Sequence, residues 1–310
     1  MDHFNVNLLT ESSLGSIASL LASFTWSFSV LMFRNHSAGR SASWLNLFKG
    51  SVALLFFGLT AIVTGLSLEL SSAVVWTLAA SGIIGVFIGD SAFFAALMRV
   101  GGTMTSAIQS LAPSLTAIFA WIFLDEILNG AQICGLTLTS ACLVLLVIKQ
   151  SARQNLKTSH SPSQIRSDYF YGVLFALIAA LCQAAGAVIA KPVIHGISPI
   201  NSAALRLWAP VLLLFFWQMR RNRGFTSTLR GLVSGRGIIP MAMASFAGTF
   251  LGLILMMYGM AHAPLGVALA LTSTYPVWIM MAEQISGKSE IGKSGFVLVL
   301  GSVAGIWLMV

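Results

Sequence analysis

Residues 85–115 have the sequence GVFIGDSAFFAALMRVGGTMTSAIQSLAPSL, and residues 248–278 have the sequence GTFLGLILMMYGMAHAPLGVALALTSTYPVW. The two stretches lie 163 positions apart, and small or helix-breaking residues coincide along them without a gap. A match of this length predicts that the chain contains two copies of one structural unit. The matched pairs are Gly85 with Gly248, Gly89 with Gly252, Ala107 with Ala270, Ser110 with Ser273 and Pro113 with Pro276.

The repeat extends toward the N-terminus at a slightly different offset. Three further pairs lie 157 positions apart, and the second half has a longer arginine-rich turn, which explains the shift of six positions. The whole of each half therefore belongs to the predicted unit. These pairs are Gly15 with Gly172, Arg34 with Lys191 and Lys49 with Arg206.

The composition excludes a soluble domain. Of the 310 residues, 57% are hydrophobic and 8% are charged, and the mean hydropathy is +0.88. Soluble domains have about 45–50% apolar and about 25% charged residues, so this chain has too few charges to cover a water-facing surface. At about 20 residues for each membrane span, the length predicts on the order of ten transmembrane helices.

The apolar runs predict an all-α membrane protein with ten transmembrane helices in two inverted five-helix repeats. The predicted boundaries are a tail over 1–13, the first repeat over 14–148, a cytoplasmic linker over 149–168 and the second repeat over 169–310. The predicted spans are 14–33, 44–64, 74–98, 104–124, 131–148, 170–193, 201–219, 238–260, 265–283 and 294–310.

The basic residues predict the orientation, because cytoplasmic loops are enriched in Lys and Arg. Fifteen of the 17 basic residues fall in the odd-numbered turns, and Lys191 and Arg206 fall on the other side. Both termini are therefore predicted to lie outside the cytoplasm. The membrane is predicted to be the bacterial inner (plasma) membrane. Since the net charge of +8 reports orientation, it does not predict a nucleic-acid partner.

Five helices in each half also require the two copies to lie upside down relative to each other. Inverted repeats are typical of secondary transporters, in which two copies rock about a site near the membrane midplane. The repeat therefore predicts transport by alternating access.

Several strings resemble the EamA-type members of the drug/metabolite transporter superfamily. They are the first-span string from Phe24 to Ser29 (FTWSFS) with Arg34, the string SLAPS at 110–114 that continues to Asp125–Glu126, and the set Pro113, Glu126, Gln132 and Gly135. The resemblance implies a central cavity lined by spans one, three, four, six, eight and nine, with spans five and ten peripheral. It also implies export of amino acids or related metabolites.

Asp90 is the leading candidate for a substrate contact. An ionisable group deep in a span is costly unless it faces a polar cavity or is protonated, so Asp90 could bind a substrate amine, exchange a proton or close a polar cluster with Ser91. Amides and aromatic rings at mid-span could recognise a polar or flat metabolite, although helix contacts and core packing are alternatives. The predicted substrate-binding residues are Trp26, Asp90, Phe94, Gln109, Ser110, Gln183, Tyr258 and Tyr275.

Paired helix interruptions predict the moving parts of the transporter. Pro113 and Pro276 occupy equivalent places and should bend their helices, and symmetric interruptions indicate a transport site. Two small-residue pairs should allow close packing of the third and eighth helices. Arg34 and Lys191, at the ends of spans one and six, are predicted to be interfacial anchors or gating charges. The paired glycines are Gly85 with Gly89 and Gly248 with Gly252.

The predicted function is secondary transport of a small polar or amphipathic metabolite, with export as the expected direction and Asp90 as the site of any proton coupling. The alternatives are an uncoupled facilitator or exchanger of the same fold and, more distantly, a membrane enzyme. No catalytic residue, metal site or cofactor is predicted, because the histidines are scattered and Cys134, Cys142 and Cys182 lie in apolar runs. The expected partners are a small-molecule substrate and membrane lipid, for a monomer or homodimer.

Overall fold

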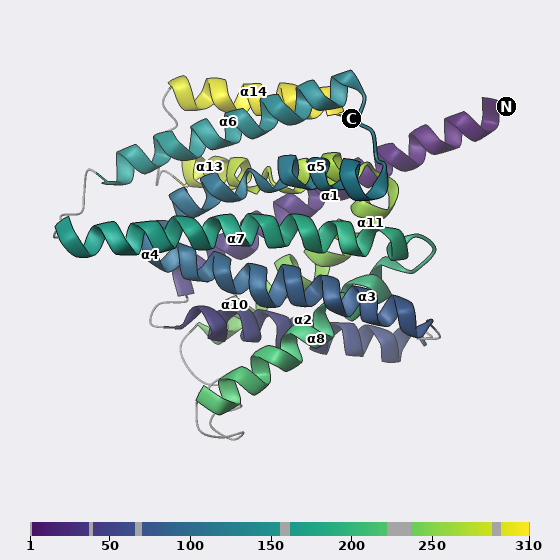
Figure 1. Ribbon diagram of the computed structural model, residues 1–310, viewed down its shortest axis with the longest axis horizontal. Coiled ribbons are helices and arrows are strands. Elements are labelled where there is room, and N and C mark those ends of the chain that lie inside the picture. Colours follow the sequence, from purple (N-terminus) through teal and green to yellow (C-terminus); the bar gives the residue numbers. More distant parts are fainter. Residues whose placement is uncertain are drawn as a thin grey trace.

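The computed structural model describes residues 2–36, 40–65, 70–155, 162–221, 237–286 and 293–309. All of the regular structure in these ranges is helical (Figure 1). The elements are α1 (Asp2–His36), α2 (Ala42–Thr64), α3 (Ser72–Gly82), η1 (Ile83–Asp90), α4 (Ser91–Gln109), α5 (Ala112–Leu124), α6 (Gly130–Asn155), α7 (Pro162–Ile194), α8 (Pro199–Arg221), α10 (Ile238–Ala244), η2 (Ser245–Leu251), α11 (Gly252–His262), α12 (Leu265–Thr272), α13 (Tyr275–Ile285) and α14 (Lys293–Met309).

These elements confirm the ten predicted spans. Among the described residues, six apolar helices are long enough to cross a membrane and four shorter apolar helices complete the set, in the predicted order. The helix ends differ from the prediction at the tail, at the linker and between spans three and four. Helix α1 already begins at Asp2. The linker between α6 and α7 is shorter than the predicted 149–168, because α6 extends to Asn155 and α7 begins at Pro162.

The predicted boundary between spans three and four is wrong. Every residue from Ser72 to Gln109 is helical, and the first non-helical residues are Ser110 and Leu111. In the second half the corresponding boundary is present, because Pro264 places the preceding residue, Ala263, in an extended conformation (φ −118°, ψ 160°). The first half has glycine at the equivalent position, 101, which does not impose that break.

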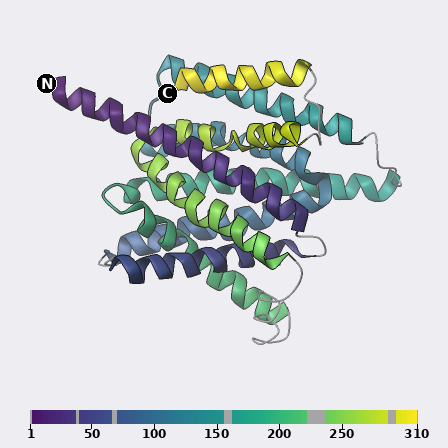
Figure 2. The same ribbon diagram turned by 180° about the vertical axis from the view of Figure 1, so that it is seen from behind.

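The fifth and tenth spans, α6 and α14, pair along one edge of the molecule (Figures 1 and 2). Glycines allow this close approach, since a Cβ on Gly135 would lie 2.5 Å from the carbonyl oxygen of Gly305. The pair is peripheral, as the family resemblance implies. The opposite edge is formed by α2 and α8.

The first helix of each half packs against helices of the other half. Helix α7 of the second half packs against α3, η1 and α4 of the first half, and α1 of the first half packs against α10, η2 and α11 of the second (Figure 2). The hydroxyl of Ser81 donates to the carbonyl oxygen of Gly186 across the first of these contacts, at 2.5 Å. Each half therefore completes the packing of the other.

Two π-helical segments occupy equivalent places in the halves. The segment η1 covers Ile83–Asp90, and at the offset of 163 it corresponds to 246–253, which overlaps η2 (Ser245–Leu251). A π-helix makes i→i+5 hydrogen bonds and is rare, and it is found frequently at functional sites. Asp90 is the last residue of η1.

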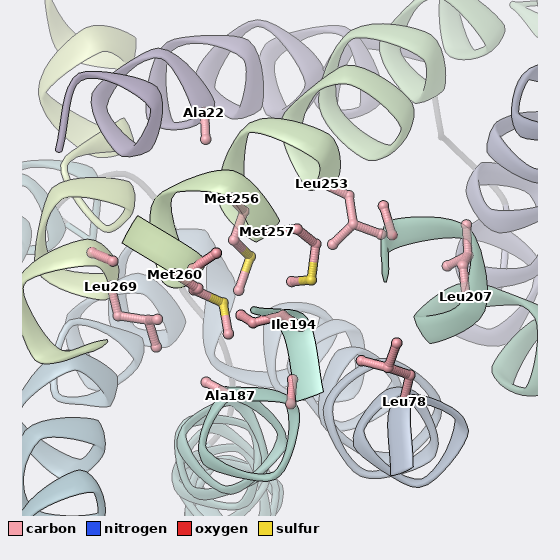
Figure 3. Packing of buried hydrophobic residues seen from close by; sticks show 14 of the residues in the cluster. Ala22, Leu78, Ala187, Ile194, Leu207, Leu253, Met256, Met257, Met260 and Leu269 are labelled. Atoms are coloured by element: carbon pink, nitrogen blue, oxygen red, sulfur yellow. The ribbon is translucent and has the colours of Figure 1, made fainter. Parts of the chain in front are cut away.

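The core between the halves is centred on three methionines of α11. Figure 3 shows Met256, Met257 and Met260 between Ala187 and Ile194 of α7 on one side and α1 on the other. All three methionines are almost fully buried. Unbranched methionine side chains can fill an irregular space between helices that cross at different angles.

Candidate functional site

An ion pair lies inside the membrane region of the first half. Lys49 on α2 donates from Nζ to Oδ2 of Asp90 at 2.5 Å, and both side chains are mostly buried. The ammonium group also lies 5.4 Å from the centre of the Phe94 ring. The Asp90 carboxylate is therefore already paired with a cation of the protein.

Arg206 is the second cation at this place. It lies on α8 with 2% of its surface exposed, and the negative charge of Asp90 acts on it. Among the residues that the structure describes, none accepts a hydrogen bond from its Nε or Nη1 atom. A Cβ on Gly85 would lie 2.9 Å from Nη2, so the glycine of η1 leaves room for the guanidinium group.

Lys49 and Arg206 are equivalent residues of the two repeats. Each lies seven residues after the start of its helix, which is about two turns inside it. Lys49 was counted among the turn charges that orient the helices, and that prediction is wrong, because its side chain is mostly buried in the helix bundle. Arg206 was counted on the opposite side, and its side chain is buried as well. The repeat places both cations close to the single carboxylate of Asp90.

An asparagine completes the cluster. The Nδ2 atom of Asn46 donates to the carbonyl oxygen of Val86 at 3.0 Å and to the hydroxyl of Ser91 at 3.3 Å. Its Oδ1 atom is buried and accepts from no group of the described residues. We call Asn46, Lys49, Asp90, Ser91 and Arg206 the polar cluster. It offers unused donors on Arg206 and one unused acceptor on Asn46.

The predicted glycine pairs lie at the contacts between the halves. A Cβ on Gly89 would be 3.1 Å from Cβ of Cys182 on α7, and one on Gly252 would be 2.6 Å from Nε1 of Trp26 on α1. Gly85 lies against Gly186 of α7, and Gly248 lies against Ser29 of α1. The pairs thus pack the third and eighth spans on the first helix of the opposite half.

Both predicted prolines lie just after a helix break. Pro113 is the second residue of α5, after the turn at Ser110–Leu111, and Pro276 is the second residue of α13, after the turn at Ser273–Thr274. The breaks are therefore symmetric. Predicted site residues flank them: Gln109, whose Oε1 atom is buried and unpartnered, the buried Ser110, and the half-buried Tyr275.

The break in the second half is fixed to α1 by hydroxyl groups. Ser23 Oγ accepts from Thr274 Oγ1 at 3.0 Å and from Trp278 Nε1 at 2.8 Å. The equivalent residues at the first break are Ala180, Leu111 and Leu115, which have no hydroxyl or indole group. The two breaks are thus alike in backbone and different in how they are held.

Lys191 joins α7 to the end of α11. Its Nζ donates to the carbonyl oxygens of Met260 at 2.6 Å and Ala263 at 2.8 Å. Beside it, Glu126 accepts from the backbone N–H of Leu265, the first residue of α12, at 2.8 Å. A cation at the C-terminus of one helix and a carboxylate at the N-terminus of the next both stabilise the helix dipoles.

Replacing Lys191 by methionine should destabilise the protein, because the carbonyl groups of Met260 and Ala263, at the end of α11, lose a charged donor. Hydrogen bonds to charged groups are worth about 1.5–3 kcal/mol, so we expect a loss of at least about 2 kcal/mol in the free energy of unfolding. Thermal unfolding of the purified protein measures this loss. The control is Arg221→Met, which removes an exposed cation and should change stability by no more than about 0.5 kcal/mol. Equal losses in the two variants would contradict the role assigned to Lys191.

The remaining predicted residues lie elsewhere in the bundle. Tyr258 stacks on His262 near the end of α11, with ring centres 4.1 Å apart, and Gln183 is half-buried on α7. The side chain of Arg34 lies outside the residues that the structure describes. The structure places Lys49 between Asp90 and the Phe94 ring, whereas the ring partner of Tyr258 is His262 of its own helix.

Sequence reasoning missed Asn46, Lys49 and Arg206 as site residues. Lys49 was assigned to a turn because the predicted span begins at position 44, only five residues before it. In the structure α2 begins at Ala42. The repeat contained the missing signal, since Lys49 and Arg206 match at the offset of 157. Basic residues that only orient loops are not expected at equivalent positions inside a helix of each repeat.

Comparisons with known proteins agree with this architecture. The sequence profile of the EamA-like transporter family matches residues 13–148 and again residues 170–310, one match for each half. A crystal structure of another protein has a TM-score of 0.74 and 16% sequence identity, and the match covers 96% of this chain and 96% of that chain. At this identity the likeness concerns the fold alone. No curated protein matches the sequence.

Proposed function

Since the chain belongs to the EamA-like transporter family, a family of multi-pass membrane transporters and not of enzymes, we propose that it is a secondary transporter of a small polar or amphipathic metabolite. The substrate is an amino acid or a related compound, and it is moved out of the cell by alternating access. The polar cluster is the substrate site. Trp26, Gln109 and Gln183 are further contacts.

The observation that carries this proposal is the position of the polar cluster. Its members lie on α2, η1, α4 and α8, which come from both halves of the chain. Buried ionisable groups in a membrane protein are costly, and they mark substrate or ion pathways. A site shared between inverted halves can be exposed alternately on either side when the halves rock.

The ion pair favours transport without proton coupling. Protonation of Asp90 would leave both Lys49 and Arg206 without a negative partner inside the protein, which is a costly state. We therefore favour the uncoupled exchanger or facilitator over the proton-coupled transporter.

Transport assays with the purified chain in lipid vesicles test this function. A thermal-stabilisation screen of amino acids, purines and amines first selects compounds that bind, and counterflow then measures their exchange. At least one amino acid or related metabolite should be exchanged, at a rate that an imposed pH gradient does not change. The absence of counterflow for every stabilising compound would overturn the function. Uptake driven by the gradient, and lost in Asp90→Asn, would instead support proton coupling.

The proposed orientation has both termini outside the cytoplasm. After Lys49, Lys191 and Arg206 are assigned to the bundle, the remaining 14 basic residues are all among those predicted for the odd-numbered turns, although Arg99 lies within α4 and not in a turn. In a cysteine-free background, a membrane-impermeant thiol reagent should label cysteine at Ser71 in intact cells. Cysteine at Ser227, which lies outside the described residues, should react only after the cells are opened. The reverse labelling pattern would show that the orientation is inverted.

A further inference from the structure

The polar cluster carries more positive than negative charge. In the described part of the chain, the charged side chains brought together here are Lys49, Asp90 and Arg206, which gives an excess of one positive charge. Asp90 is bonded to Lys49. A buried charge is stable only when it is paired or well hydrogen-bonded, so the cluster lacks one anionic partner.

Arg206 is the cation that needs this partner. Its side chain is almost completely buried, and its Nε and Nη1 atoms donate to no group in the described part of the chain. A guanidinium group presents its N–H donors in a planar fork that matches the two oxygens of a carboxylate. The missing partner is therefore expected to be planar and anionic.

Asn46 adds the other half of the recognition. Its Nδ2 donates to Val86 and Ser91, which fixes the orientation of the amide, and its Oδ1 is an acceptor with no partner among the described residues. An acceptor of this kind can receive a hydrogen bond from an ammonium or hydroxyl group of the same ligand.

We propose that the transported substrate carries a carboxylate and that Arg206 binds it. This inference rests on the proposed transport function and specifies the chemical class of the substrate. The bound carboxylate supplies the second negative charge, so that Lys49 pairs with Asp90 and Arg206 pairs with the substrate.

The same charge balance favours exchange over net flux. The empty site leaves the guanidinium charge of Arg206 unpaired within the membrane, whereas in the loaded site the substrate carboxylate pairs with it. Because moving an unpaired buried charge is costly, the loaded protein should change conformation faster than the empty one. Counterflow should therefore be faster than net efflux of the same compound.

The test uses matched sets of small molecules on the purified full chain. Each set contains an amino acid, the carboxylic acid that lacks its amine and the amine that lacks its carboxylate, for all the common side chains. Dissociation constants follow from the concentration dependence of thermal stabilisation. Compounds with the carboxylate should stabilise the protein, and the matched amines should not.

Charge-changing variants separate binding from a structural role of Arg206. In Lys49→Met, Asp90 is released to pair with Arg206, so carboxylate affinity should fall by about tenfold or more, as expected for the loss of a charge-assisted contact. In Lys49→Met/Asp90→Asn the excess charge returns, and the affinity should recover. Arg206→Gln should abolish carboxylate binding, and Arg99→Gln, on the exposed side of α4, should leave it unchanged.

Three outcomes would overturn the carboxylate proposal: binding of amines only, no binding of any carboxylate in the sets, or equal carboxylate affinity in wild type and Lys49→Met. Because Lys49→Met keeps a pair at Arg206, it tests the proposal even where Arg206→Gln does not fold. Counterflow of neutral compounds or amines without counterflow of carboxylates would leave the transport function intact and refute only the substrate class. Absence of counterflow for every compound would refute the transport function itself.

Discussion

Replacing Gly82 by alanine should prevent α3 and α8 from packing and remove most of the folded protein. A methyl group on Gly82 would overlap the backbone carbonyl of Arg206 and would lie 3.0 Å from Cγ of Pro210. Neither group can rotate away, since one belongs to the backbone and the other to a proline ring. The two helices would have to separate, and Arg206 would move with α8.

The expected loss is at or above the upper end of the range for overpacked cores, which is about 1–3 kcal/mol. Thermal unfolding and the yield of monodisperse protein after extraction in detergent measure it. Gly58→Ala is the matched control, because Gly58 lies in α2 with nothing within 4 Å of the added methyl group. Alanine is favoured over glycine inside a helix by about 0.5–1 kcal/mol, so this variant should be as stable as wild type or more stable. Similar behaviour of the two variants would contradict the close approach of α3 to α8.

The second large effect is expected for Asp90→Asn. This change removes the only carboxylate among the described residues of the polar cluster and leaves Lys49 and Arg206 as two buried cations. Removing one member of a buried ion pair costs as much as about 3–5 kcal/mol, because the remaining charge is uncompensated. We therefore expect a large decrease in the free energy of unfolding, measured by thermal or denaturant unfolding.

Asp125→Asn controls for the chemistry of this substitution. Asp125 is exposed and has a positive φ of 53°, which asparagine adopts readily. The free energy of unfolding of this variant should therefore differ from that of wild type by no more than about 0.5 kcal/mol. The double variant Lys49→Met/Asp90→Asn should recover part of the lost stability, because one unpaired cation is removed. If Asp90→Asn unfolded at the same temperature as wild type, the ion pair would not contribute to the stability of the protein.

The number, order and approximate limits of the spans could be predicted because they depend on local composition. A run of apolar residues is sufficient to define a membrane helix. The prolines were equally informative. Pro113 and Pro276 lack the N–H that a helix interior uses, which favours the breaks before them, although Pro210 lies inside the unbroken helix α8. The missing break near 98–104 shows the limit, because glycine permits a turn and does not enforce one.

The polar cluster could be predicted only in part. Asp90 was identified because an acid inside an apolar run is costly wherever it lies. Its pairing with Lys49 depends on how α2 lies beside η1, and no local pattern contains this information. The π-helical geometry of η1 and η2 was also not foreseen, because the residues of these segments are ordinary apolar and small residues of membrane helices.

The contact between α1 and α10–η2–α11 has a consequence for biosynthesis. Helix α1 ends at His36 and its partner begins only at Ile238, so about 200 residues must be synthesised before the two can meet. At roughly 5–20 residues per second, α1 waits on the order of 10–40 s in the membrane. During this time three of its serines need no partner on another helix, since Ser19, Ser23 and Ser27 each donate to a carbonyl of α1 itself. The first helix can thus remain in lipid alone until the second half of the chain arrives.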